Sequence, residues 1–190
     1  MNERRREKHA GFTMVEILMV IVLIALVAAF GIPKLNFSGY RINSGVRSVT
    51  SLIERAQRMA VTDQNNVNVL FDVPNNQIKI HDDNNNDNSM QGGERVFTYP
   101  MPEGVVFGHN GAPARLYAAV HVSFSRSESG LREIIFRRDG SASENGGFYI
   151  TTTTAQKSNR PQDARSIEVI RSTGRVEWYQ YNGSSWIKKF

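Results

Sequence analysis

The chain has 190 residues and no cysteine, and 23 lysines and arginines against 18 aspartates and glutamates give it a formal net charge of +5. This surplus is too small to indicate nucleic-acid binding by itself. Without cysteine the chain cannot form disulfides, so an exported domain must be stabilised by packing, or by packing and a metal ion. Apart from its N-terminal segments, about 158 residues remain, which is enough for one soluble domain with a core.

The N-terminus combines a basic leader, residues 1–11, with an apolar stretch over residues 12–32. Only Thr13 and Glu16 are clearly polar within that stretch. At ~1.5 Å per residue it would be a helix ~31 Å long, close to the thickness of a bilayer core, so we expect a transmembrane and assembly helix over 12–32. The basic leader predicts that the N-terminus stays in the cytoplasm and that the rest of the chain faces the periplasm or the outside.

The junction between Gly11 and Phe12 lies before the apolar stretch, whereas a secretory signal is cut after its apolar region. This arrangement resembles the prepilin leader of type IV pilins and type II secretion pseudopilins. The resemblance implies that a prepilin peptidase in the membrane cuts after Gly11 and methylates the new amino terminus at Phe12. Glu16 then takes the place of the family's acidic fifth residue, and Pro33 that of its helix-kinking proline.

Glu16 needs a partner, because a carboxylate in a membrane helix costs roughly 2.5–3.5 kcal/mol on insertion scales. The sequence offers no lysine or arginine between Gly11 and Lys34. We therefore expect Glu16 to pair with the amino group created at Phe12 of a neighbouring subunit in a filament. The alternative is a single-pass anchor that tolerates an unpaired glutamate.

The next segment, residues 33–63, is expected to continue the helical spine. Apolar residues recur at steps of three and four, which predicts an amphipathic helix from about 40 to 61. The apolar face contains Ile42, Val46, Val49, Leu52, Ile53, Ala56, Met59 and Ala60, and the opposite face carries Arg41, Arg47, Glu54, Arg55 and Arg58. We expect the apolar face to pack on the domain's own sheet.

From residue 67 the apolar period changes to two, which predicts strands. The first alternation covers 67–73, and a turn at 74–76 leads to a strand with Ile78 and Ile80. Further strands are expected at 95–99, 104–107, 120–125, 131–136, 148–154, 166–170 and 175–181. The predicted fold class is α+β, with a long N-terminal helix packed on an antiparallel β-sheet domain over 64–190.

Three short patterns in this half resemble the GspH/FimT-like minor pseudopilins. They are the Asp/Asn-rich loop from Asp82 to Glu94, the turn 136–140 (Phe-Arg-Arg-Asp-Gly) and the closing segment 173–176 (Thr-Gly-Arg-Val). The resemblance implies a non-enzymatic minor pseudopilin of a type II secretion pseudopilus or a type IV pilus. Such a subunit is held in the inner membrane and assembles with other pilins or pseudopilins.

The Asp/Asn-rich loop also has the spacing of a calcium-binding loop, whose ligands stand at positions 1, 3, 5, 7, 9 and 12. The corresponding residues are Asp83, Asn85, Asp87, Ser89, Gln91 and Glu94. The usual glycine at position 6 is replaced by Asn88, which also tolerates a left-handed backbone. The sequence predicts no helix on either side, so a true EF-hand is not expected. The alternative is a solvated polar surface loop.

The sequence gives no support for catalysis. Its four histidines, His9, His81, His109 and His121, are scattered, and no nucleophile elbow, zinc-protease helix, phosphate loop or dinucleotide fingerprint is present.

DNA binding is the alternative function, because some FimT-like proteins capture DNA through a Gly-Arg-x-Arg near the C-terminus. The candidate contacts here are Arg175, Lys188 and Lys189, with aromatic residues between them. Glu177, however, stands where the second arginine of the motif would be.

Overall fold

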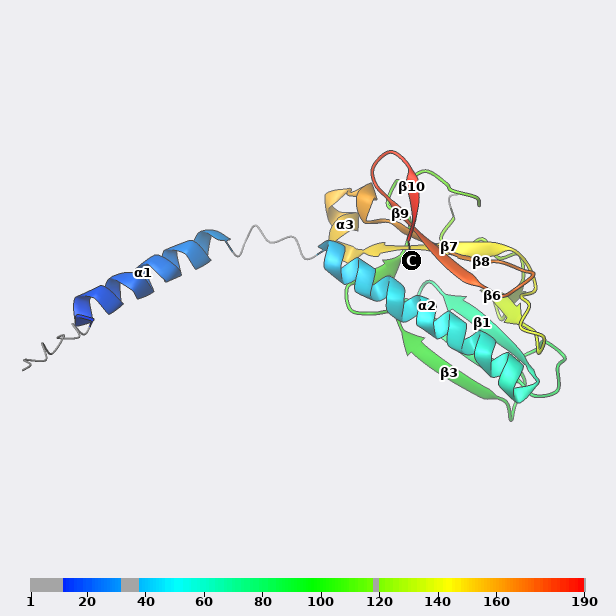
Figure 1. Ribbon diagram of the computed structural model, residues 1–190. Helices are drawn as coiled ribbons and strands as arrows, with labels where there is room; N and C mark the ends of the chain where they lie inside the picture. The colour runs from blue at the N-terminus through cyan, green and yellow to red at the C-terminus, as the bar shows by residue number, and fades with distance from the viewer. Residues whose placement is uncertain (1–11, 32–37, 118–119, 190) are drawn as a thin grey trace, which may run out of the picture. The chain divides into compact units, whose positions relative to one another are not determined.

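The computed structural model describes residues 12–31, 38–117 and 120–189. The chain divides into two units, residues 1–37 and residues 38–190. The first contains helix α1 and the second contains all the other helices and strands (Figure 1).

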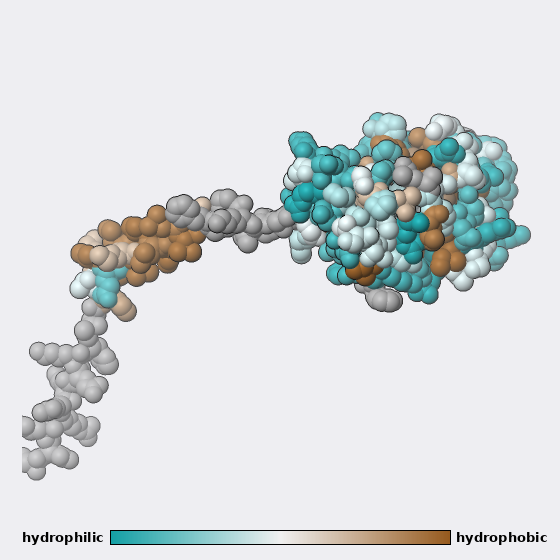
Figure 2. Space-filling model, turned by 90° about the horizontal axis from the view of Figure 1, so that it is seen from above, coloured by the Kyte–Doolittle hydropathy of each residue, from teal (hydrophilic) through white to brown (hydrophobic). Residues whose placement is uncertain are grey.

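Helix α1 (Met14–Gly31) begins just after Thr13, which caps it. The Thr13 carbonyl accepts the Glu16 and Ile17 N–H groups at 3.1 and 3.2 Å, and its hydroxyl oxygen accepts the Glu16 N–H at 3.3 Å. The surface of α1 is apolar over most of its length (Figure 2). Within the described ranges, no helix is long and apolar enough to cross a membrane. Ile32 and Pro33 lie outside those ranges, and the transmembrane helix over 12–32 stays a prediction.

Helix α2 (Ser38–Asp63) confirms the predicted amphipathic helix and extends it by two residues at each end. The predicted apolar face is buried at Ile42, Val46, Val49, Ile53, Ala56 and Ala60, while Leu52 and Met59 are half-buried against the same core. The charged residues of the opposite face are exposed. The helix therefore forms because its apolar stripe is covered by the sheets of its own domain.

Ten strands in the described residues form two antiparallel sheets of five. The first sheet has the order β3-β2-β1-β6-β5, and the second has the order β10-β9-β8-β7-β4. The strands are β1 (Asn66–Asp72), β2 (Gln77–Asp83), β3 (Arg95–Pro100), β4 (Val105–Phe107), β5 (Ser127–Glu128), β6 (Leu131–Phe136), β7 (Gly146–Thr152), β8 (Arg165–Val169), β9 (Val176–Tyr181) and β10 (Trp186–Lys189). Helix α2 contacts strands of both sheets (Figure 1), so the α+β fold class is confirmed.

Four phenylalanines join the two sheets in one core. The Phe71 ring lies 4.7 Å from that of Phe148 and 5.3 Å from that of Phe124, measured between centroids. Phe107 meets Phe71 edge-on at 6.3 Å. All four are nearly fully buried, so this cluster supplies much of the apolar area that holds the sheets together.

The turn between β1 and β2 is held by the Asp72 carboxylate. It accepts hydrogen bonds from the Asn75 backbone N–H at 3.2 Å, from the Asn75 amide at 3.0 Å and from Gln77 at 2.8 Å. Lys79 lies 3.1 Å away. These contacts, the Asn75 hydrogen bond first among them, hold the pKa of Asp72 well below its usual range although burial opposes them. The predicted turn at 74–76 is thereby confirmed.

The predicted strand at 120–125 is wrong. Only Val122 forms a bridge, to Phe148, because β4 already pairs with residues Ile150–Thr152 on that edge of β7. The predicted strand at 148–154 starts at Gly146 and ends at Thr152, whose hydroxyl accepts the Ala155 N–H and caps helix α3 (Thr153–Ser158).

Besides α3, two strands were not predicted from the sequence. Strand β5 lies within the polar segment 125–130 and pairs with β6, and β10 follows the turn after β9 and pairs with it. A 3-10 turn (Pro161–Asp163) precedes β8. Both strands are short edge strands that owe their place to a neighbour, so their own sequence carries little signal.

Candidate functional site

The predicted processing and assembly residues lie at the start of α1. Gly11 is outside the described residues, and Phe12 lies just before the capping residue Thr13 with 80 % of its surface exposed. Glu16 stands in the first turn, and its carboxylate forms no ion pair within the described part of this single chain. A negative charge is favourable at this position, close to the helix N-terminus.

The Asp/Asn-rich loop uses its own carboxylates as hydrogen-bond acceptors. Asp83, which is fully buried, accepts the N–H groups of Asp87 and Asn88 at 3.2 and 2.8 Å. Asp87 accepts the Ser89 N–H at 2.8 Å and the Asn85 amide at 3.0 Å. Asn88 has φ of 60°, the left-handed backbone that its place in the loop predicts.

The last predicted calcium ligand, Glu94, is turned towards a histidine. Its Oε2 lies 2.7 Å from His81 Nε2 and accepts the Gln91 N–H at 2.8 Å. Among the described residues, no three His, Cys, Asp or Glu side chains are grouped so that they could hold a metal ion. The hydrogen bonds thus favour the alternative, a polar loop that closes on itself, and calcium binding stays an untested prediction.

The candidate DNA contacts line a groove of about 320 Å³ between α2 and the β9–β10 hairpin. Arg175, Lys188 and Lys189 lie there with Arg47 of α2. Glu177 lies among them: Lys188 Nζ is 2.7 Å and Arg175 Nη2 is 3.4 Å from its Oε1. The Lys188 hydrogen bond is the main reason that the pKa of Glu177 lies below its usual value. Glu177 and Glu54 therefore offset two of the four positive charges that line the groove.

The turn 136–140 and the segment 173–176, two of the patterns on which the GspH/FimT resemblance rests, meet at Gln57 of α2. The Gln57 amide donates to the Gly140 carbonyl at 2.8 Å and to the Thr173 carbonyl at 2.7 Å. Gly174 has φ of +62°, and an added Cβ would lie 2.2 Å from the Gly140 oxygen, so only glycine fits. We call Gln57, Gly140, Thr173 and Gly174 the Gln57 clasp. Sequence patterns indicated both loops but not the glutamine that joins them.

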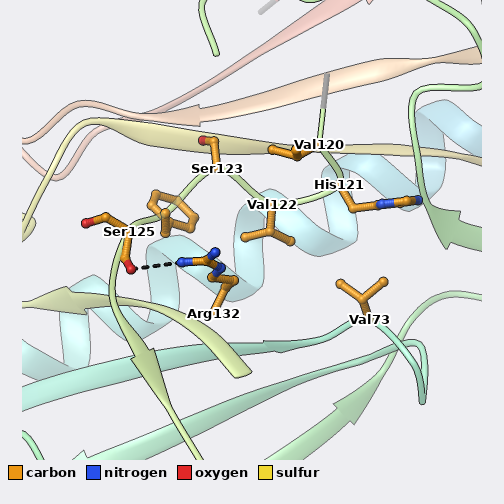
Figure 3. Close-up of a pocket in the computed structure, with 8 residues that line it drawn as sticks. Val73, Val120, His121, Val122, Ser123, Ser125 and Arg132 are labelled. Carbon is orange, nitrogen blue, oxygen red and sulfur yellow. Dashed lines mark hydrogen bonds between the residues drawn. The ribbon is translucent and has the colours of Figure 1, made fainter. Parts of the chain in front are cut away.

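A hollow of about 520 Å³ lies where the two sheets meet (Figure 3). Val73 of the β1–β2 turn and Arg132 of β6 face the segment 120–125, and Arg132 donates to the Ser125 carbonyl at 2.9 Å. Ser123 donates its hydroxyl to the Gly147 carbonyl at 2.9 Å, and Ser125 donates to Glu144. The Ser123 hydroxyl is therefore held by a backbone carbonyl, and the Ser125 hydroxyl by a carboxylate.

The described histidines are as scattered as the sequence predicts. His81 is buried beside Glu94, His109 donates from Nδ1 to the Ala112 carbonyl at 3.1 Å, and His121 lines the hollow. They do not form a common site.

Comparison with known families gives one match, the prokaryotic N-terminal methylation motif, over residues 6–32. The chain is therefore pilin-like at its N-terminus. The matched segment includes Gly11, Phe12 and Glu16, and it ends at Ile32. No curated protein sequence matches this pilin-like chain.

Among solved structures, two of the minor pseudopilin EpsH from the type 2 secretion system of Vibrio cholerae are similar to the pilin-like chain. One has 10 % identity and a TM-score of 0.48, and covers 74 % of this chain and 97 % of its own. The other has 12 % identity and a TM-score of 0.44, with coverage of 79 % and 99 %.

Proposed function

We propose that this protein is a minor pseudopilin, a non-enzymatic structural subunit of a type II secretion pseudopilus or a type IV pilus. The methylation motif over 6–32 carries this proposal, because the Gly11–Phe12 step and the apolar helix α1 both lie within it. Before assembly the subunit is held in the inner membrane by a single span, with residues 64–190 in the periplasm. Its partners are the prepilin peptidase and other pilins or pseudopilins.

In this proposal, processing after Gly11 creates an amino group at Phe12, and Glu16 of a neighbouring subunit pairs with it. The folded domain is tied firmly to the start of α2: Ser38 donates to Asp163 at 2.6 Å, and Arg165 donates to Asn43 at 3.0 Å. Such bonds hold α2 and the domain together, so that both move as one rigid unit when α2 is pulled in a filament.

Blocking the cut tests the proposal. Gly11→Val puts a branched side chain at the cut site and should leave the leader in place, about 1.3 kDa of a 21.4 kDa chain. Ala10→Val, a comparable increase in volume one residue earlier, should still be processed. Mass spectrometry distinguishes the two forms. An intact leader on the wild-type protein, in cells that make the peptidase, would refute the proposal.

The charge pairing is tested by Glu16→Ala. The substitution removes the cost of a carboxylate in an apolar helix, so membrane insertion should be easier, but the mutant should be depleted from sheared filaments. Met14→Ala, a truncation of similar size on the same turn without a change of charge, should assemble normally. Recovery of Glu16→Ala at wild-type abundance in filaments would contradict the pairing.

DNA capture, the alternative function, is less well supported by the groove between α2 and the β9–β10 hairpin. Glu177 sits where a second arginine would contact phosphate, and it pairs with both Lys188 and Arg175. A phosphate entering there would have to compete with a carboxylate already in place.

A further inference from the structure

Strand β3 (Arg95–Pro100) leaves one edge of the first sheet open. It stands at the end of the strand order, and among the described residues it pairs only with β2, in a register that sets Pro100 opposite Gln77. The ladder continues one step further, where the Met101 N–H donates to the Asn76 carbonyl at 3.0 Å.

The direction of the free backbone groups follows from that bond. In an antiparallel ladder, hydrogen-bonded and non-hydrogen-bonded pairs alternate. Since Met101 bonds to β2, so do Tyr99, Phe97 and Arg95, whereas the N–H and C=O groups of Val96 and Thr98 point away from the sheet. Pro100 also faces outward, where its missing N–H costs the ladder nothing.

Strand β3 exposes apolar side chains to an unusual degree. Five of its six residues are exposed, including Val96 at 40 % and Phe97 at 36 % of their surface. Soluble proteins generally protect a free edge with lysines, very short strands or inward charges. The other edge strands of the described sheets follow this rule: β4 and β5 have three and two residues, and β10 contains Lys188 and Lys189. Strand β3 is long, apolar and without lysine.

We propose that β3 is an interface on which a second copy of this chain docks, joining the two first sheets edge to edge in antiparallel orientation. A two-fold axis through Phe97 sets Val96 of one copy opposite Thr98 of the other, and Phe97 opposite Phe97. This register pairs every outward N–H and C=O of Val96 and Thr98, in four hydrogen bonds. A shift by two residues would instead place Pro100, which has no N–H, opposite Val96.

The charges of the strand also suit a second copy. Arg95 is the only charged residue of β3, and it is already paired with Asp82 of β2, with Nε 3.1 Å from the carboxylate. Two copies can therefore meet without facing like charges. In the same register Arg95 lies opposite Tyr99 of the other copy, on the face that carries Phe97. Strand β3 belongs to the second unit, so this pairing does not depend on how α1 assembles.

Cysteine cross-linking of the full-length protein in detergent tests this pairing, because the natural chain has no cysteine. Residues opposite each other in a non-hydrogen-bonded pair have Cα atoms about 4.5 Å apart, within the range that a disulfide spans. Phe97→Cys should therefore form a disulfide dimer under mild oxidation. Ile187→Cys is the matched control, because Ile187 lies on edge strand β10 and is 42 % exposed. We expect on the order of tenfold more dimer at position 97, since pairing raises the effective concentration of the thiols.

A second substitution separates strand pairing from chance collision. Thr98→Pro removes an N–H that points away from β2, so the fold should be kept, while two of the four intermolecular hydrogen bonds are lost. In combination with Phe97→Cys it should abolish the cross-linked dimer, with the melting temperature of the chain nearly unchanged. Equal cross-linking at positions 97 and 187 would overturn the pairing. A cross-linked dimer that persists through position 97 in a folded Thr98→Pro variant would overturn it as well. A disulfide to a different protein in membranes would assign the edge to another partner.

Discussion

Replacing Gly174 by alanine tests the Gln57 clasp, because this glycine lets two loops approach α2. At φ of +62°, the left-handed backbone strains an alanine by about 1–2 kcal/mol. Its Cβ would also meet the Gly140 oxygen at 2.2 Å, so the loops must separate and the two Gln57 hydrogen bonds, worth about 0.5–1.5 kcal/mol each, are weakened. The expected loss of unfolding free energy is about 3 kcal/mol. At about 2–4 °C per kcal/mol, the melting temperature should fall by about 6–12 °C.

The matched control is Gly130→Ala, measured by the same thermal scan in near-ultraviolet circular dichroism. Gly130 has φ of +80°, but an added Cβ meets nothing within 4 Å, so alanine pays for the backbone alone. The backbone strain costs about 1–2 kcal/mol. At about 2–4 °C per kcal/mol, the melting temperature should fall by about 2–8 °C. Gln57→Ala should be destabilising alone, and add little to Gly174→Ala, because both break the same contacts. Equal losses for Gly174→Ala and Gly130→Ala would refute the role of the clasp.

Three further predictions concern charged groups. The low pKa of Asp72, held mainly by Asn75, stabilises the fold above the unfolded-state pKa of about 3.9. Asp72→Ala should therefore lower the melting temperature at pH 7, and its difference from wild type should shrink as the pH falls below that value. For the loop 83–94, melting should be equal with millimolar calcium and with chelator; a rise of several degrees with calcium would instead support an ion site. Wild-type protein should not shift duplex DNA at physiological salt, whereas Glu177→Gln should bind it more tightly at low salt; strong salt-dependent binding by wild type would favour the DNA alternative.

The sequence by itself determines the elements whose signal is local. The apolar steps of three and four fix α2 and its buried face, because a helix brings those positions to one side whatever covers them. Strand β6 is predicted with both of its ends correct, since an apolar run stands between clear turn residues. The family match over residues 6–32 is likewise a property of contiguous sequence, and Gly11, Phe12 and Glu16 lie within it.

The tertiary structure decides wherever a residue's role depends on a distant neighbour. The segment 120–125 has the composition of a strand, but β4 already pairs with Ile150–Thr152 of β7, and the segment keeps only the bridge from Val122 to Phe148. Glu94 has the spacing of a calcium ligand, yet His81, brought alongside by the β2–β3 hairpin, takes its carboxylate. Gln57 donates hydrogen bonds to Gly140 and Thr173, which lie 83 and 116 positions further along the chain. The local sequence pattern shows which element a segment can form. Which segment pairs with an open strand edge, and which group a carboxylate or an amide bonds to, is decided only when the sheets and α2 pack together.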